Sequence, residues 1–158
     1  MSGNGRFRYP LQPILLTRQW DLDALLSDLA SIRQSIAILQ RDLQKLQNQG
    51  AALAAGWKRE SEIRNDMNVD QFVTAARFMH DLSMKIRSIR NSVEEWQKKE
   101  ISLLDSIMRA KRGIDAVEHH RDELRAEFFK SKSKEQFKAL DDHWAILQER
   151  KDADAGEH

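Results

Sequence analysis

Three short groups of acidic and histidine residues are the parts of this sequence whose types could bind a metal ion or serve in catalysis. The run HHRDE at 119–123 lacks the two histidines, four residues apart around a glutamate, that zinc proteases use. The run DDH at 141–143 spreads over different sides of a helix, because neighbouring helical residues point in different directions. The run DLD at 21–23 lacks the glycine and the final glutamate of a calcium loop. We therefore interpret all three as solvated surface groups, and we expect no metal and no cofactor.

No other pattern predicts an enzyme or a nucleic-acid partner. The sequence contains no cysteine and no glycine-rich phosphate loop. The run KSKSK at 130–134, with Phe129 before it and Phe137 after it, has the basic and aromatic character that can bind single strands. However, Glu127 and Glu135 border this run and the whole chain has a net charge of only +1, so we expect no nucleic-acid binding. No apolar run approaches the ~18 residues of a membrane helix, so we expect no direct membrane insertion.

The composition favours long helices. The 158 residues are 32% charged and 41% hydrophobic, with 6 glycines and 2 prolines. Both prolines, Pro10 and Pro13, lie near the N-terminus, so no later proline interrupts a helix. We expect one all-α domain over residues 1–158.

Two long segments repeat apolar residues in alternating steps of three and four, which is the a/d pattern of a coiled-coil seam. The first predicts a helix over about 14–64, and the second predicts a longer helix over about 69–149. The first seam consists of Leu22, Leu25, Leu29, Ile32, Ile36, Leu39, Leu43, Leu46, Gly50, Leu53 and Trp57. The second consists of Phe72, Ala75, Met79, Leu82, Ile86, Ile89, Val93, Trp96, Glu100, Leu103, Ile107, Ala110, Ile114, Val117, Arg121, Leu124 and Phe128, where only Glu100 and Arg121 are out of character.

The segment between the seams predicts a turn at about 65–68. Asn65, Asp66 and Asn68 are turn formers, and Asn68 with Gln71 three residues later resembles a capping box. A short loop makes the two helices antiparallel neighbours. The sequence therefore predicts a long antiparallel two-helix coiled-coil hairpin whose second helix is longer than the first.

Side-chain sizes suggest a register in which the numbers of facing residues sum to about 132. This register sets large residues against small ones, which suits dense packing. It opposes Gly50 to Leu82 and Trp57 to Ala75.

In this register the first helix ends opposite about residue 121, so the last part of the second helix has no predicted neighbour. The seam restarts there out of phase as Phe137, Leu140, Trp144 and Leu147. An uncovered apolar stripe indicates a partner protein. The alternative is that residues 1–12 fold over part of it, and both can hold. We otherwise expect flexible ends at 1–12 and 150–158.

The whole chain resembles the FliJ/YscO family, the central-stalk proteins of flagellar and injectisome type III secretion ATPases. The opening FRYPLQPILLTRQWDLDALLSDLA, the layout of the second helix and the ending KEQFKALDDHW carry the resemblance over about residues 6–150. The resemblance implies a cytoplasmic, non-enzymatic protein located peripherally at the inner-membrane secretion apparatus. It does not separate the flagellar from the injectisome system.

The resemblance also implies partners and contact residues. Members insert the end that carries both termini into the hexameric export ATPase, and they also contact the export-gate membrane protein and handle export chaperones. The gate-contacting positions of flagellar members fall on Phe72, Ala76, Met79 and Ser83, although those members have a larger aliphatic residue at Ala76 and a histidine at Ser83. For the ATPase contact, the terminal apolar residues are the hypothesis: Phe128, Phe129, Phe137, Leu140 and Trp144.

Two functions therefore follow from the sequence. The first is an export stalk that links the ATPase to the gate. The alternative is a structural coiled-coil adapter or dimerisation protein with no secretion role, in which the terminal stripe pairs with a second copy.

Overall fold

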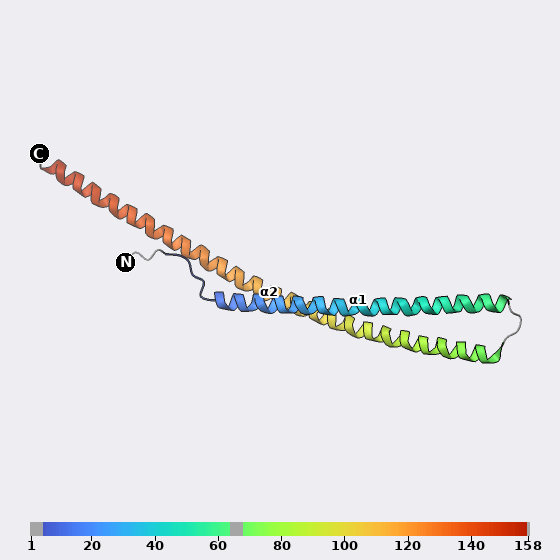
Figure 1. The fold of residues 1–158 in the computed structure, drawn as a ribbon. Helices are drawn as coiled ribbons and strands as arrows, with labels where there is room; N and C mark the ends of the chain where they lie inside the picture. The colour runs from blue at the N-terminus through green and yellow to red at the C-terminus, as the bar shows by residue number, and fades with distance from the viewer. Residues whose placement is uncertain (1–4, 64–67, 158) are drawn as a thin grey trace. The chain divides into compact units, whose positions relative to one another are not determined.

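The computed structural model describes residues 5–63 and 68–157, and these residues form two α-helices (Figure 1). Helix α1 spans Gln12–Ile63 and helix α2 spans Val69–Gly156. The all-α class is confirmed, with two helices that pack against each other and a longer second helix. Because α2 continues to Gly156, the predicted helix end near residue 149 is wrong for residues 150–156. The predicted turn at 65–68 lies outside the described residues, except for Asn68.

Local hydrogen bonds explain where each helix begins. The amide of Asp70 donates to Asn68 Oδ1 at 3.1 Å, so Asn68 caps α2 as its residue type predicts. At the other start, the amide of Gln12 donates to the carbonyl oxygen of Tyr9 at 3.2 Å. Pro13 follows within the first turn of α1, where a missing N–H removes no helical hydrogen bond.

Contacts divide the chain into two compact units, whereas the sequence predicted one continuous hairpin. The hairpin unit comprises residues 21–110. The terminal unit comprises the residues up to Trp20 together with the residues from Lys111 onward. Each unit contains a part of α1 and a part of α2.

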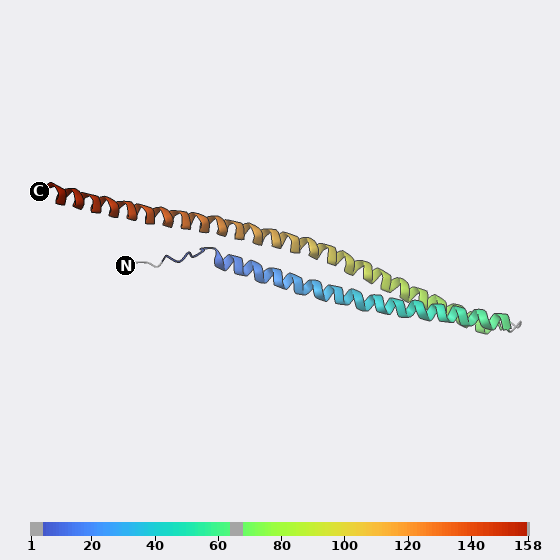
Figure 2. The ribbon, with the colours of Figure 1, turned by 90° about the horizontal axis from the view of Figure 1, so that it is seen from above.

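In the hairpin unit, the arm from α1 and the arm from α2 lie side by side (Figures 1 and 2). Its buried side chains all occupy predicted seam positions, which confirms that the seams face each other here. A Cβ built on Gly50 would lie 3.1 Å from Leu82 Cδ2, the contact that the predicted register requires. The buried residues of this unit are Leu29, Ile36, Leu82, Val93 and Ile107.

Glu100, the first residue that is out of character on the second seam, has a specific neighbour. Arg33 Nε lies 3.7 Å from Glu100 Oε1, and the Glu100 side chain is 25% exposed. A half-buried carboxylate at a seam position thus gains a cation from the facing helix. The exposure keeps the electrostatic gain small, on the order of 0–1 kcal/mol.

In the terminal unit, the non-helical residues before α1 lie along α2. We call residues 5–11 the strap. Within this unit Leu15 is only 1% exposed, and Tyr9 and Ile114 are also buried. The strap therefore packs on α2 at His120 and Phe128. The stripe of Phe137, Leu140, Trp144 and Leu147 stays exposed, so the alternative in which the N-terminal segment folds over part of this stripe is wrong for the described residues.

Candidate functional site

The hairpin unit carries an apolar hollow near the loop between its arms. The hollow has a volume of about 1000 Å³. Both arms of the hairpin unit line it, α1 through residues 52–60 and α2 through residues 70–79. We call this hollow the tip groove. It is lined by Ala52, Leu53, Ala54, Gly56, Trp57, Glu60, Asp70, Gln71, Phe72, Thr74, Ala75, Ala76, Phe78 and Met79.

The tip groove brings together three of the four predicted gate-contact residues. Phe72 is 49% exposed and Met79 is 38% exposed, although both occupy seam positions. Ala76 lines the tip groove and also a smaller hollow beside it. Ser83 is exposed but lines neither hollow, so the structure does not join it to the other three.

Phe72 and Met79 stay accessible because they line this hollow rather than a closed seam. Trp57 is half-buried, and its ring centroid lies 6.1 Å from that of Phe72. The predicted register sets Ala75 opposite Trp57, and the large Trp57 ring reaches the residue one turn before Ala75. An apolar groove with aromatic walls fits an apolar side chain or an amphipathic helix of a partner.

The second apolar surface is the end of α2 in the terminal unit. Neither view shows another segment beside the red end of this helix (Figures 1 and 2). Every described residue from Phe129 to Glu157 is exposed. Phe137 is 65% exposed, Leu140 57% and Trp144 68%. We call residues 133–157 the tail, and its stripe of large apolar side chains has no cover within the described chain.

Phe128 and Phe129 differ from the other three predicted ATPase-contact residues, because Phe128 contacts the strap and Phe129 contacts an arginine. The ring of Phe7 in the strap packs on Phe128 with centroids 5.6 Å apart, so Phe128 is half-buried. Phe129 is 50% exposed, and the Arg125 guanidinium lies 5.8 Å from the centre of its ring. A partner that contacts this region meets Phe129, Arg125 and the strap, rather than Phe128 alone.

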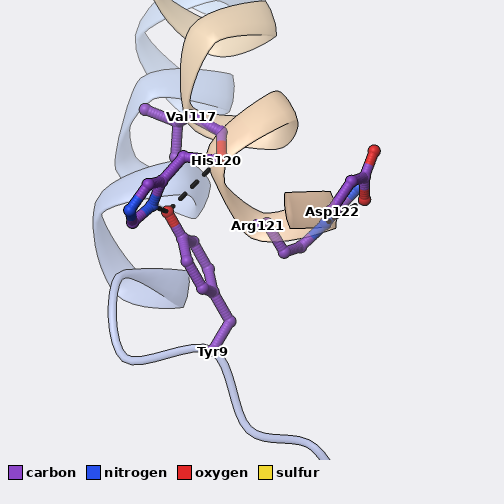
Figure 3. Close-up of polar contacts among 5 residues, drawn as sticks. All are labelled: Tyr9, Val117, His120, Arg121 and Asp122. Carbon is purple, nitrogen blue, oxygen red and sulfur yellow. Dashed lines mark hydrogen bonds and ion pairs between the residues drawn. The ribbon is translucent and has the colours of Figure 1, made fainter. Parts of the chain in front are cut away.

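Polar contacts hold the strap against α2 (Figure 3). The Tyr9 hydroxyl oxygen lies 2.8 Å from His120 Nδ1, and the hydroxyl also donates to the Val117 carbonyl oxygen at 3.4 Å. Lys132 Nζ donates to the carbonyl oxygen of Gly5 at 3.5 Å. The strap is thus anchored at several points along α2.

The run HHRDE, interpreted as a surface group without a role, therefore supplies a strap contact. His120 faces Tyr9, whereas His119 pairs with Glu123 at 3.0 Å on an exposed face. Sequence reasoning expected Tyr9 only as part of an N-terminal segment that covers the apolar stripe, and it assigned no role to His120 or to the arginines near them. The available signal was the alternation of arginine and aromatic residues in RFRY at 6–9, which is typical of an extended segment with one apolar face.

The described residues contain no group of three or more His, Asp or Glu side chains placed to hold a metal ion. No helix among them combines the length and the apolar character that crossing a membrane requires.

Comparison with known proteins found no match to this chain among protein-family models, curated proteins or solved structures.

Proposed function

We propose that this protein is a non-enzymatic stalk of a type III protein export apparatus. The tail contacts the hexameric export ATPase, and the tip groove contacts the export-gate membrane protein. The observation that carries the proposal is the tail: a helical stripe of large apolar residues that the described chain leaves uncovered. The resemblance to the FliJ/YscO family supplies the identity of the partners.

The two surfaces suit these two partners in different ways. The tail presents Phe137, Leu140 and Trp144 along one helix face, so a ring of subunits can bury them around a single helix. The tip groove presents Phe72 and Met79 beside Trp57, which suits insertion of an apolar side chain of the gate or of an export chaperone. Both contacts would act at the cytoplasmic side of the inner membrane.

Binding to the export ATPase tests the tail. We expect the full chain to bind the purified ATPase and to raise its ring assembly and turnover. Trp144→Ser should weaken this binding by about tenfold, since burying a large aromatic residue contributes roughly 1.5–3 kcal/mol. Trp20→Ser is the matched control, because Trp20 is also 68% exposed. Equal loss in both variants, or no loss in Trp144→Ser, would rule out the tail as the ATPase contact.

The exposed tail also fits the alternative function, a structural adapter, in which the tail of a second copy covers it. Sedimentation of the isolated chain separates the two functions. A stalk should sediment as a monomer over the micromolar range. A dimer that Trp144→Ser dissociates, together with no binding to the ATPase, would favour the adapter instead. A gene for a hexameric export ATPase beside the gene for this chain would support the stalk.

A further inference from the structure

The strap and α2 enclose a second hollow, in the terminal unit, with a volume of about 810 Å³. Four of its nine lining residues are arginines, and none of these nine described residues carries a carboxylate. We call it the arginine cleft. It is lined by Gly5, Arg6, Phe7, Arg8, Tyr9, Gln12, Arg121, Arg125 and Phe129.

Both walls of the arginine cleft are held in place. Tyr9 is 8% exposed and its hydroxyl contacts His120 at 2.8 Å, while Phe7 packs on Phe128. These two anchors fix the strap residues between and beside them, Arg6 and Arg8. The opposite wall is α2 itself, where Arg121 and Arg125 lie one turn apart and so share a face.

The positive charge of the arginine cleft is only partly neutralised. Arg121 Nε lies 3.4 Å from Asp122 Oδ1. Arg6, Arg8 and Arg125 are exposed, and within the described part of the chain none of them lies within 4.0 Å of a carboxylate oxygen. Guanidinium groups bind carboxylates through paired, charge-assisted hydrogen bonds. Phe129 adds an apolar surface beside them.

We propose that the arginine cleft binds a short acidic peptide segment of a partner protein. The arginines take its carboxylates, and an apolar side chain of the segment rests on Phe129. The site is defined by its own residues, so the inference goes beyond the proposed export role and stands without it. Guanidinium groups also pair with phosphates, so a phosphate ligand is the competing outcome of the test. The apolar ring of Phe129 beside the arginines favours a peptide that carries an apolar side chain next to its carboxylates.

Fluorescence anisotropy with the full-length protein tests this proposal. The probe is a labelled peptide of alternating glutamate and leucine. The comparison ligands are the same peptide with glutamine for glutamate, an oligothymidylate single strand, and tripolyphosphate. We expect only the acidic peptide to bind well, with an affinity that falls as salt rises.

Paired variants locate the binding. Arg8→Gln with Arg125→Gln should weaken peptide binding by at least about tenfold, because both substitutions remove charge-assisted hydrogen bonds to the peptide carboxylates. Arg125→Lys should lose part of the affinity, since lysine keeps the charge but not the paired geometry. The control is Arg87→Gln with Arg90→Gln, two exposed arginines of the hairpin unit that change net charge equally. Circular dichroism and trypsin cleavage at Arg6 check that helices and strap are intact.

Four results would overturn the proposal. The first three are failure of the acidic peptide to bind, equal binding of the glutamine peptide, and equal weakening of peptide binding by the control pair. The fourth is tighter, Arg8- and Arg125-dependent binding of oligothymidylate or tripolyphosphate, which would assign the cleft to phosphate ligands.

Discussion

The Tyr9 hydroxyl oxygen lies 2.8 Å from His120 Nδ1, and this contact joins a strap without regular secondary structure to a long helix. The hydroxyl donates when Nδ1 is unprotonated, and it accepts when Nδ1 carries the proton. Since the hydroxyl is also within reach of the Val117 carbonyl oxygen, either arrangement leaves it a partner. Docking of the strap on α2 thus depends on the buried Tyr9 and its neighbours His120 and Val117.

Removing the His120 imidazole should loosen the strap. We expect His120→Ala to weaken strap docking by about 1 kcal/mol, the usual value for one hydrogen bond, and so to raise strap opening about fivefold. Trypsin cleavage after Arg6 or Arg8 measures the opening, because the variant leaves the strap sequence unchanged. His119→Ala is the control, since His119 is exposed and contacts Glu123 instead. Identical cleavage rates in the two variants would contradict a role of His120 in docking the strap.

Two glycines of α1 should respond differently to alanine. No described atom lies within 4 Å of a Cβ built on Gly56, so Gly56→Ala should stabilise the protein by about 0.5–1 kcal/mol through helix propensity. A Cβ on Gly50 would lie 3.1 Å from Leu82 Cδ2, so Leu82 must move and Gly50→Ala should gain less. Urea unfolding midpoints compare the two variants. An equal gain would show that the arms are not in close contact at Gly50.

Phe72 and Leu82 occupy the same seam but differ in what they contribute. Leu82 is 5% exposed, so Leu82→Ala should reduce the free energy of unfolding by about 2–4 kcal/mol. Phe72 is 49% exposed, so Phe72→Ala should cost roughly half of that or less while it removes one wall of the tip groove. Thermal unfolding and a pull-down with the proposed partner, the export-gate protein, measure the two effects. If Phe72→Ala lost helicity and gate binding in parallel, Phe72 would be a core residue only.

Replacing Glu100 by leucine should stabilise the hairpin unit. Glu100 holds a half-buried seam position, and its partner Arg33 is 59% exposed at the side chain, so the ion pair contributes little. Leucine would bury apolar area instead, and we expect a gain of about 0.5–1.5 kcal/mol in urea unfolding. Arg33→Gln should change stability by less than about 0.5 kcal/mol. A destabilised Glu100→Leu protein would mean that the ion pair holds the arms in register.

The heptad pattern predicted the fold because each helix of a two-helix unit buries only one stripe of side chains. The a and d residues form this stripe, so their spacing shows which face of each helix is packed. Leu29, Ile36 and Leu82 sit where the stripe places them. The end of α2 was predicted too early because KDADA at 151–155 is polar, yet it contains no helix breaker before Gly156. Polarity indicates exposure, and an exposed segment can still be helical.

The candidate site was only partly predictable. The uncovered residues Phe137 and Trp144 follow from periodicity, since a stripe without a facing helix must remain open. The strap has no periodicity over its few residues, so nothing local assigns Tyr9 to His120. The arginine cleft combines Arg8 with Arg125, which are far apart in sequence, and only the docked strap brings them to one hollow.

The tail gains no stability from packing, because every described side chain in it faces solvent. Its helix rests on backbone hydrogen bonds and intrinsic propensity, and a helix held in this way melts over a broad temperature range. We therefore expect the circular dichroism signal of this protein to decline in two regimes on heating, a shallow slope from the tail and then a steep step from the packed seams. With a partner bound to the tail, we expect the tail to unfold together with the packed seams in the steep transition.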